Sequence, residues 1–311
     1  MTKTEAKANN RDTRALDRRT MLGITGAGLA GSLVACVGTQ QASETSADRR
    51  RRFDGKVVIV TGATSGIGRA AAMQFAAEGG KVGFCGRREN LGKEVERLIK
   101  AAGGEATYLR ADVRIESDVK AFVDAIVAKY GRLDVAFNNA GITIEKPLHE
   151  YSSQEWDDVS NTNLRGVFLA MKYEVPYMID GGGGNIVVTS SSNAIATTEG
   201  RSAYTASKRG LVGLVQSVAL DYASRRIRVN TLLPGTTDTA LVRRSAGMEN
   251  VPDAIWEVMA KQWAKSHVSG LARMATADEI AAFALVLGSD DHPYMTGSQM
   301  VIDGGKTAHA G

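Results

Sequence analysis

A tyrosine and a lysine four residues apart are the first pair in this chain whose chemistry can be predicted. Tyr204 and Lys208 stand in Tyr204-Thr-Ala-Ser-Lys208, and on a helix this spacing places both side chains on one face. A phenol with an ordinary pKa near ~10 is a poor base at neutral pH. A neighbouring ammonium favours the phenolate and lowers that pKa, which makes a tyrosine usable as a general acid or base. The pair therefore predicts proton transfer, whereas Tyr204 alone would indicate only a packed aromatic side chain.

A serine near the end of a predicted strand supplies a third polar group. Ser191 lies thirteen residues before Tyr204 and follows the apolar run 185–189. In that place its hydroxyl can hydrogen-bond a substrate oxygen and stabilise the charge that develops there. Side chains alternate along a strand, so we expect Ser190 to face the other way. Ser191 thus joins the tyrosine and lysine as a candidate catalytic residue.

An apolar strand runs directly into a glycine-rich turn near residue 60. The run 56–61 is followed by Gly62-Ala-Thr-Ser-Gly66-Ile-Gly68. In such a turn Gly62 allows the chain to leave the strand, Gly66 lets the backbone approach a pyrophosphate, and Gly68 permits close helix packing. The helix that begins near Ile67 then presents free N–H groups to the phosphates. Strand, loop, helix and second strand in this order predict a dinucleotide site.

The end of the second predicted strand decides which dinucleotide fits. An acidic side chain there binds the ribose 2′-hydroxyl of NAD, and a basic one suits the 2′-phosphate of NADP. The chain has Gly86-Arg87-Arg88 at this point and no acid. Because a guanidinium offers a planar fork to phosphate, Arg87 favours NADP(H). NAD(H) is the alternative if Arg87 only stacks on the adenine.

Predicted strands and helices alternate from residue 53 to the end of the chain. Short apolar runs separated by helical patterns are typical of a parallel sheet covered on both faces. The fold class is therefore α/β: a single doubly wound Rossmann domain over residues 53–311, with a mostly parallel, seven-stranded sheet. The predicted strands are 57–61, 82–85, 107–109, 133–137, 185–189, 227–232 and 299–302, and the predicted helices include 69–78, 89–101, 119–130 and the one that carries Tyr204.

Together these motifs resemble the short-chain dehydrogenase/reductase family over about residues 53–305. The resemblance rests on Thr61-Gly-Ala-Thr-Ser-Gly66-Ile-Gly68, Asn138-Asn-Ala-Gly141, Asn163, Ser191, Tyr204, Lys208, Pro234-Gly235 and Thr239. It implies that Asn163 completes a catalytic tetrad and holds a water that links Lys208 to solvent in a proton relay. It also implies that Asp112 and Val113 lie at the adenine, that 138–141 braces the sheet beside the adenosine, and that 234–239 flanks the nicotinamide. A homotetramer is implied as well.

The candidate site follows from these motifs. The candidate catalytic residues are Asn163, Ser191, Tyr204 and Lys208. The candidate cofactor-binding residues are Thr61, Gly62, Ser65, Gly66, Ile67, Gly68, Arg87, Asp112, Val113, Asn138, Ala140, Gly141, Tyr204, Lys208, Pro234, Gly235, Thr237 and Thr239. No metal site is expected, because the two cysteines and four histidines lack ligand spacing.

The first 36 residues are typical of an export signal. A basic stretch ends in Arg18-Arg19, which resembles a twin-arginine signal. An uncharged and weakly apolar stretch of small residues follows. It ends in Leu33-Val-Ala-Cys36, which resembles a lipobox and favours a lipid anchor through Cys36; an ordinary peptidase site or an uncleaved anchor are the alternatives. Residues 37–52 read as a flexible, arginine-rich tether. The prediction is export to the periplasm or cell envelope, or a cytoplasmic protein if the signal is misread.

The overall charge does not point to nucleic acid. The net charge of +4 is concentrated in basic residues that precede the first strand, so it describes the N-terminal segment rather than a binding surface.

Most members of the family that this chain resembles are cytoplasmic enzymes, so an export signal departs from the family pattern. Export would require the cofactor to be carried out bound, which the twin-arginine route permits because it moves folded proteins.

These features predict an NAD(P)(H)-dependent enzyme that interconverts a secondary alcohol and a ketone, with Tyr204 as general acid/base. A 3-oxoacyl carrier-protein reductase is the alternative within the same class. A non-catalytic dinucleotide-binding sensor or scaffold in the cell envelope is the alternative from another class, and the intact tetrad argues against it.

The segment 240–274 is expected to shape the substrate site through Trp256, Met259 and Trp263, although at least one tryptophan is expected in the core. Residues expected at the mouth are Ile142, Ser192, Asn193 and Ala194.

Overall fold

The computed structural model describes residues 51–268 and 270–308. These residues belong to one compact unit, Asp48–Gly311. The predicted export signal 1–36, with Cys36, lies outside the described residues, as does all but the end of the tether 37–52.

The described chain forms a seven-stranded sheet in which every pair of neighbouring strands is parallel. The strand order is β3-β2-β1-β4-β5-β6-β7, so the order reverses between β1 and β4. This confirms the predicted doubly wound α/β fold, and the sheet is wholly rather than mostly parallel. The strands are β1 (Val57–Thr61), β2 (Lys81–Gly86), β3 (Glu105–Arg110), β4 (Val135–Asn138), β5 (Gly184–Thr189), β6 (Ile227–Pro234) and β7 (Gln299–Ile302).

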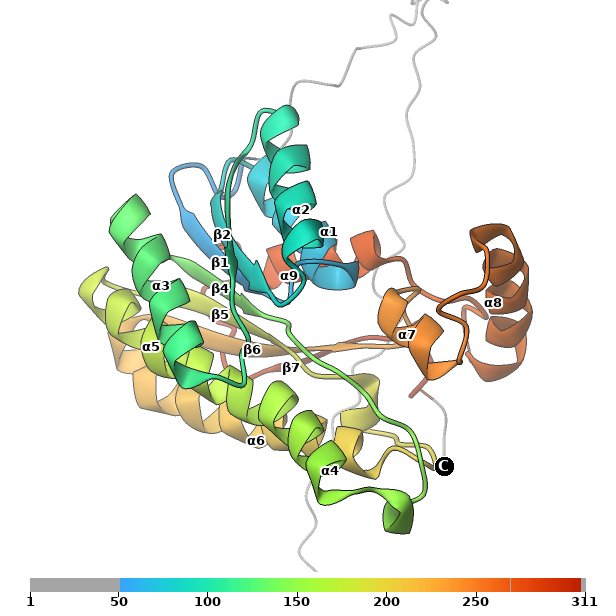
Figure 1. The fold of residues 1–311 in the computed structure, drawn as a ribbon. Helices are drawn as coiled ribbons and strands as arrows, with labels where there is room; N and C mark the ends of the chain where they lie inside the picture. Colours follow the sequence, from blue (N-terminus) through green and yellow to red (C-terminus); the bar gives the residue numbers. More distant parts are fainter. Residues whose placement is uncertain (1–50, 269, 309–311) are drawn as a thin grey trace, which may run out of the picture. The chain divides into compact units, whose positions relative to one another are not determined.

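Helices cover both faces of the sheet (Figure 1). One face carries α1 (Gly66–Ala77), α2 (Glu89–Ala101) and α9 (Ala277–Gly288). The other carries α3 (Glu116–Tyr130), α5 (Gly166–Asp180) and α6 (Ser202–Tyr222). Three further helices are α4 (Ser153–Ser160), α7 (Ala240–Ser245) and α8 (Asp253–His267). Within the described residues, none of the helices combines the length and apolar character needed to span a membrane.

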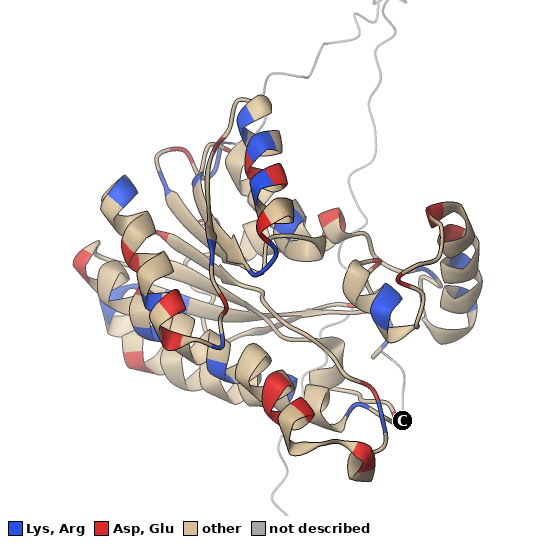
Figure 2. Cartoon of the chain, in the orientation of Figure 1, with Lys and Arg blue, Asp and Glu red and all other residues tan. Residues whose placement is uncertain are grey.

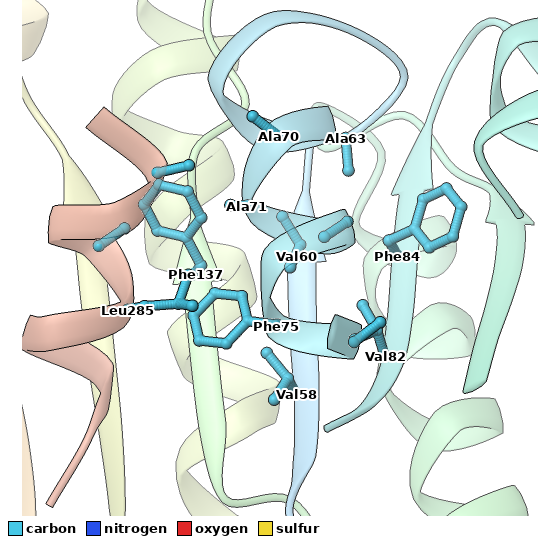
Figure 3. Close-up of a cluster of buried hydrophobic side chains, with 14 of the residues drawn as sticks. Val58, Val60, Ala63, Ala70, Ala71, Phe75, Val82, Phe84, Phe137 and Leu285 are labelled. Atoms are coloured by element: carbon cyan, nitrogen blue, oxygen red, sulfur yellow. The ribbon is translucent and has the colours of Figure 1, made fainter. Parts of the chain in front are cut away.

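The core consists of two main apolar clusters, one on each face of the sheet. In β1, Val58 and Val60 point into the cluster under α1 and α9, whereas Val57 and Ile59 point into the cluster under α3, α5 and α6. Figure 3 shows the first cluster, where Phe75 of α1 packs between strands and α9. Because a strand alternates its side chains, a continuous apolar run can bury both faces at once. This is why the run 57–60 reads as uniformly hydrophobic.

Element boundaries differ from the predicted ones by a few residues. The helix predicted at 69–78 begins at Gly66, and the helix predicted at 119–130 begins at Glu116. The third strand is longer than predicted and spans Glu105–Arg110, with both end residues exposed. Hydrophobic periodicity locates buried positions, so it misses the polar residues that begin a helix or end an edge strand.

One acidic side chain is fully buried under the sheet. Glu174 of α5 is 0% exposed, and its Oε2 accepts a 2.8 Å hydrogen bond from Asn138 Nδ2 at the end of β4. Glu174 Oε1 and Asn138 Oδ1 are both buried without another hydrogen-bond partner among the described residues. A proton on the carboxyl group would supply the missing donor to this pair, since burial disfavours the carboxylate. The side chain of Asn138, predicted to bind the cofactor, therefore faces α5 and not the cleft.

Replacing Glu174 by glutamine is expected to remove a pH-dependent loss of stability. Burial raises the pKa of Glu174 from 4.5 to about 7 in the folded protein. The folded state therefore binds the extra proton, and its stabilisation is complete below pH 4.5 and is lost as the pH rises through about 7. The loss amounts to about 3 kcal/mol above this window. Glu174→Gln keeps a donor toward Asn138 at every pH, so its free energy of unfolding should lack this decline.

Urea denaturation of the cofactor-free protein across this pH window measures the effect. Glu257→Gln is the matched control, because Glu257 is exposed on α8 and its variant should follow the wild type. Identical pH profiles for Glu174→Gln and the wild type would contradict a protonated, buried Glu174.

Candidate active site

A cleft lies at the carboxyl edge of the sheet, where the strand order reverses. Parallel α/β sheets bind ligands at such a switch point, because the loops from adjacent strands diverge there. The cavity has a volume of about 630 Å³ and is lined by segments that follow β1, β2, β4, β5 and β6, together with α7 and α8. It is therefore large enough for both a dinucleotide end and a small substrate.

The glycine loop is packed so closely that side chains are excluded from it. Gly62 has φ +70, and a Cβ placed on it would lie 2.7 Å from Ala140 Cα. A Cβ on Gly68 would lie 2.5 Å from the Gly62 carbonyl oxygen, so this glycine brings α1 against the loop. Thr61 Oγ1 accepts hydrogen bonds from the backbone N–H groups of Asn139 (3.0 Å) and Ala140 (3.2 Å). These contacts fix the start of α1 at the floor of the cleft.

These observations fit a dinucleotide. Gly66 begins α1 with φ +57, which leaves the first N–H groups of the helix facing the cleft without a side chain in the way. Fifteen predicted cofactor residues line the cavity: Gly62, Ser65, Gly66, Ile67, Arg87, Asp112, Val113, Ala140, Gly141, Tyr204, Lys208, Pro234, Gly235, Thr237 and Thr239. Thr61, Gly68 and Asn138 do not line it; the first two brace the loop and the third faces α5.

The three candidate proton-transfer residues meet in this cleft. Ser191 follows β5 by two residues, and its hydroxyl hydrogen-bonds the Tyr204 hydroxyl from the facing end of α6. Lys208, one turn further along α6, donates from Nζ to the Thr189 carbonyl oxygen at 2.7 Å. Its Nζ lies 5.7 Å from the centroid of the Tyr204 ring. Ser190 also borders the cavity, but its hydroxyl is directed to the backbone of α6 and donates to the Lys208 carbonyl oxygen at 2.8 Å.

Burial dominates the electrostatics of this group. Desolvation raises the pKa of Tyr204, although the hydrogen bond from Ser191 and the charge of Arg201 oppose that shift. Desolvation also lowers the pKa of Lys208 to about 7. The expectation that the ammonium lowers the pKa of Tyr204 is therefore not met in this structure, because Lys208 itself loses much of its charge near neutral pH. Tyr204 holds its proton here.

Asn163 lies in a π-helical turn, Asn161–Arg165, between α4 and α5. Its Oδ1 accepts from the Ile142 N–H at 2.8 Å, and its Nδ2 donates to the Ile142 carbonyl oxygen at 2.9 Å and to Ser207 Oγ at 3.0 Å. The side chain thus ties the segment after β4 to α6. A Cβ on Gly141 would lie 3.4 Å from Asn163 Oδ1 and 3.5 Å from Lys208 Nζ, so Asn163 and the lysine flank the same glycine. The water relay stays a prediction.

Three arginines gather at the other end of the cleft, and two of them were missed in the sequence. Arg87, Arg88 and Arg244 all line the cavity. Arg88 donates to Thr64 Oγ1 at 2.9 Å and to Ser65 Oγ at 2.6 Å, and its pKa is lowered by burial and by the charges of Arg244 and Arg87. Figure 2 shows basic residues at the start of α2 and on α7, the segments that carry them. Arg88 is adjacent in sequence to Arg87, so it could have been predicted with it. The sequence of α7 contains no motif that predicts a place for Arg244 in the cleft.

The segment after β6 builds the outer wall of the cleft. Trp256 is 2% exposed and donates from Nε1 to Asp238 Oδ1 at 2.8 Å, which makes it the tryptophan expected in the core. Trp263 and Met259 line the cavity and are 39% and 40% exposed. Of the residues expected at the mouth, Ile142, Ser192 and Asn193 line the cavity and Ala194 does not.

Residues 51–268 and 270–308 contain no cluster of three histidine, cysteine, aspartate or glutamate side chains arranged to hold an ion. Cys85 is a free thiol buried in the core, and burial raises its pKa to about 12.

Comparisons with known proteins agree with this geometry. Residues 62–307 match a family model described as enoyl-(acyl carrier protein) reductase. The chain is 39% identical over 270 residues to 3beta-hydroxysteroid dehydrogenase of Mediterraneibacter gnavus, covering 83% of this chain and 97% of that protein. It is 38% identical over 256 residues to 3-oxoacyl-[acyl-carrier-protein] reductase FabG of Thermotoga maritima, covering 82% and 98%.

A solved structure of known fold is also similar to this chain. The crystal structure of levodione reductase superposes with a TM-score of 0.76 at 34% identity, covering 83% of this chain and all of that one. The chain belongs to the short-chain dehydrogenase/reductase family of oxidoreductases.

Replacing Gly62 by alanine is expected to destabilise the protein far more than the same change at Gly55. The two glycines have almost the same backbone angle, φ +70 and φ +72, so both variants carry about 1 kcal/mol of left-handed strain. Only Gly62 has Ala140 within reach of the new methyl group, whereas nothing lies within 4 Å at Gly55. Overpacking adds about 2 kcal/mol at Gly62. Chemical denaturation measures both variants, and equal losses would show that the Gly62–Ala140 packing is unimportant.

Proposed function

We propose that this protein is an NAD(P)(H)-dependent oxidoreductase that interconverts a secondary alcohol and a ketone. One observation carries the proposal: the hydroxyls of Ser191 and Tyr204, with Lys208 beside them, lie in the same cleft as the glycine loop. A substrate oxygen near these hydroxyls would place its carbon close to a nicotinamide ring between them and the segment after β6.

The proposed chemistry divides between the cofactor and the chain. The nicotinamide, when bound, gives a hydride to the carbonyl carbon or takes one from the alcohol carbon. Ser191 donates a hydrogen bond to the substrate oxygen and stabilises its developing negative charge. Tyr204 delivers its proton to that oxygen in reduction and removes it in oxidation. Lys208, held by the Thr189 carbonyl oxygen, would favour the phenolate when its ammonium is protonated.

Reduction and oxidation need opposite protonation states of Tyr204. Reduction needs the phenol, whose proton goes to the substrate oxygen, and burial raises the pKa of Tyr204 toward that form. Alcohol oxidation needs the phenolate instead, which a charged Lys208 favours.

Replacing Tyr204 by phenylalanine is expected to lower kcat by about a thousandfold while NADPH still binds with nearly unchanged Kd. The reason is that general acid catalysis contributes about 10²–10⁴-fold and the phenol ring is retained. The assay follows nicotinamide absorbance with NADPH and NADH in parallel, over a panel of secondary alcohols, ketones, sugars, steroids and diketones. Equal losses of turnover and of cofactor binding would contradict the assigned role of Tyr204.

The basic end of the cleft supports NADP(H) as the preferred cofactor. Among the described residues Arg87, Arg88 and Arg244 make no ion pair, although they lie close enough for Arg87 and Arg244 to lower the pKa of Arg88. Like charges that face a cavity and have no ion-pair partner suit a doubly negative phosphate. Asp112 offsets them only in part: the charge of Arg87 helps to lower its pKa, but its carboxylate is paired with Arg114 at 2.7 Å.

Replacing Arg87 by alanine is expected to raise the Kd for NADPH about tenfold to a hundredfold and the Kd for NADH less than about threefold. A lost charge-assisted hydrogen bond costs about 1.5–3 kcal/mol, and only NADPH has the phosphate to lose it. Fluorescence titration measures both cofactors, and Arg225→Ala, at an exposed position before β6, is the control. Parallel losses for both cofactors would assign Arg87 to the adenine rather than to a 2′-phosphate.

One alternative has specific support. FabG of Thermotoga maritima is among the relatives, which keeps a 3-oxoacyl carrier-protein reductase as the second candidate. The same substrate panel, extended with a 3-oxoacyl thioester, separates the two. A dinucleotide-binding sensor or scaffold is the third, and it would bind cofactor tightly without turning over any compound.

Location and assembly are separate proposals. The twin-arginine and lipobox resemblances support export, with Cys36 as the lipid attachment point, and the family supports a homotetramer. Fractionation of cells that express the chain with and without Arg18→Lys and Arg19→Lys tests the first, and sedimentation of the purified protein tests the second.

A further inference from the structure

The acids that line the cleft are already paired, whereas several cations are not. Asp112 is bound to Arg114 at 2.7 Å, and Glu145 is bound to Arg201 at 2.7 Å. The arginines at the adenosine end have the cofactor phosphates as ligands in the proposed function. One lining cation at the opposite end, Lys306, is left without an assigned ligand.

Lys306 lies in a turn that is fixed against the nicotinamide end of the cleft. The turn follows β7, and its start is held because the Gly235 N–H donates to the Ile302 carbonyl oxygen at 2.9 Å. Its middle is held because the Leu271 N–H, just after α8, donates to the Gly304 carbonyl oxygen at 2.9 Å. In Figure 1 this last segment of the coloured chain runs below α7 and α8. Lys306 therefore stands between the segment after β6 and the outer wall of the cleft.

The nearest acid in the sequence, Asp303, makes no ion pair with this lysine, although its charge opposes the lowering of the lysine's pKa. Asp303 Oδ1 accepts from the Gly305 N–H at 3.0 Å, and Oδ2 accepts from the Thr307 N–H at 2.8 Å and from Thr307 Oγ1 at 2.6 Å. Both carboxylate oxygens are thus used within the turn. Across residues 51–268 and 270–308, the Lys306 ammonium makes no hydrogen bond or ion pair.

A second cation lies close to the lysine and to the reacting groups. Arg201 immediately precedes α6, three residues before Tyr204; its charge helps to lower the pKa of Lys306 and opposes the rise in the pKa of Tyr204. Burial is the main cause of the lowered pKa of Lys306. Arg201 is itself paired with Glu145 at 2.7 Å, so the half-buried Lys306 ammonium is the main source of positive potential at this end of the cleft.

The wall beside this charge is apolar and aromatic. Met248, Met259 and Trp263 line the cavity, and the Trp263 ring stacks on His267 with centroids 4.6 Å apart. The exposed part of this wall offers an apolar surface for a substrate body. A substrate with a carbonyl at Tyr204, an apolar body on this wall and an anionic end at the lysine would satisfy all three environments.

We propose that Lys306, with Arg201 beside it, forms a subsite for a carboxylate carried by the substrate at a distance from the reacting carbonyl. The substrate class is then an apolar keto acid or hydroxy acid rather than a neutral ketone. This inference rests on the proposed function. A single ammonium suits a singly charged carboxylate, whereas a phosphate or sulfate is normally met by more donors.

The experiment uses the full chain with its cofactor and a series of methyl ketones that carry a terminal carboxylate on chains of increasing length. Each acid is paired with its methyl ester, which keeps the shape and removes the charge. The expected result is a kcat/KM about tenfold to a hundredfold higher for the acid at the best chain length, since a charge-assisted contact contributes about 1.5–3 kcal/mol. Added salt should reduce the preference.

Variants at Lys306 decide whether the preference arises there. Lys306→Gln should remove it by raising KM for the acid while leaving the kinetics of the ester and the Kd of the cofactor unchanged, and Lys306→Arg should retain it. Equal use of acid and ester by the wild type, or a preference that survives in Lys306→Gln, would overturn the proposal.

A binding measurement separates this proposal from the proposed function. Calorimetric titration of the enzyme–cofactor complex with acid and ester reports the subsite even if no compound turns over. Acid-selective binding that is lost in Lys306→Gln, without turnover, would support the subsite and contradict the oxidoreductase function. Turnover of esters without acid-selective binding would support the function and overturn the subsite.

Discussion

The close approach of three backbone segments at the end of β1 is the constraint on which the site depends. Gly62 and Gly68 have no side chains, so the glycine loop, the first turn of α1 and the segment after β4 meet within van der Waals distance. Thr61 adds two hydrogen bonds to the same segment. This contact fixes where the N-terminus of α1 points and where the loop after β4 begins. The residues that follow both elements line the cleft because of it.

Charge is distributed unevenly along the cleft, and the unevenness follows from which acids are already paired. Asp112 and Glu145 each have an arginine partner, so neither neutralises the remaining cations. At one end three arginines face the space proposed for the adenosine phosphate. At the other end Lys306 faces the space proposed for the substrate. The three arginines are exposed like charges that repel one another, so a negative ligand would relieve their repulsion, and one at the other end would pair with the half-buried Lys306.

Desolvation also explains why the protein alone favours the neutral forms of the proton-transfer residues. Tyr204 and Lys208 are buried, and burial disfavours the charged form of each: it raises the pKa of the phenol and lowers that of the ammonium to about 7. The same burial strengthens any later electrostatic interaction, because no water screens it. Ser191 and the Thr189 carbonyl oxygen hold the two groups in place meanwhile.

The sequence by itself determined the order of strands and helices, the glycine loop and the spacing of Tyr204 and Lys208, because all of these depend on residues that are close together in the chain. Strand alternation also determines that Asn138 faces the same side of the sheet as Ala136 and the opposite side from Phe137. Only the tertiary structure decided that Asn138 meets Glu174, that Arg244 joins Arg87 and Arg88, and that Lys306 reaches the site. Each of these pairs side chains from elements far apart in sequence, and burial or the loss of a partner exists only once the chain has folded. The pKa values of the site also depend on the folded structure. Motif spacing predicted a charged lysine beside the tyrosine, whereas burial raises the pKa of Tyr204 and lowers that of Lys208.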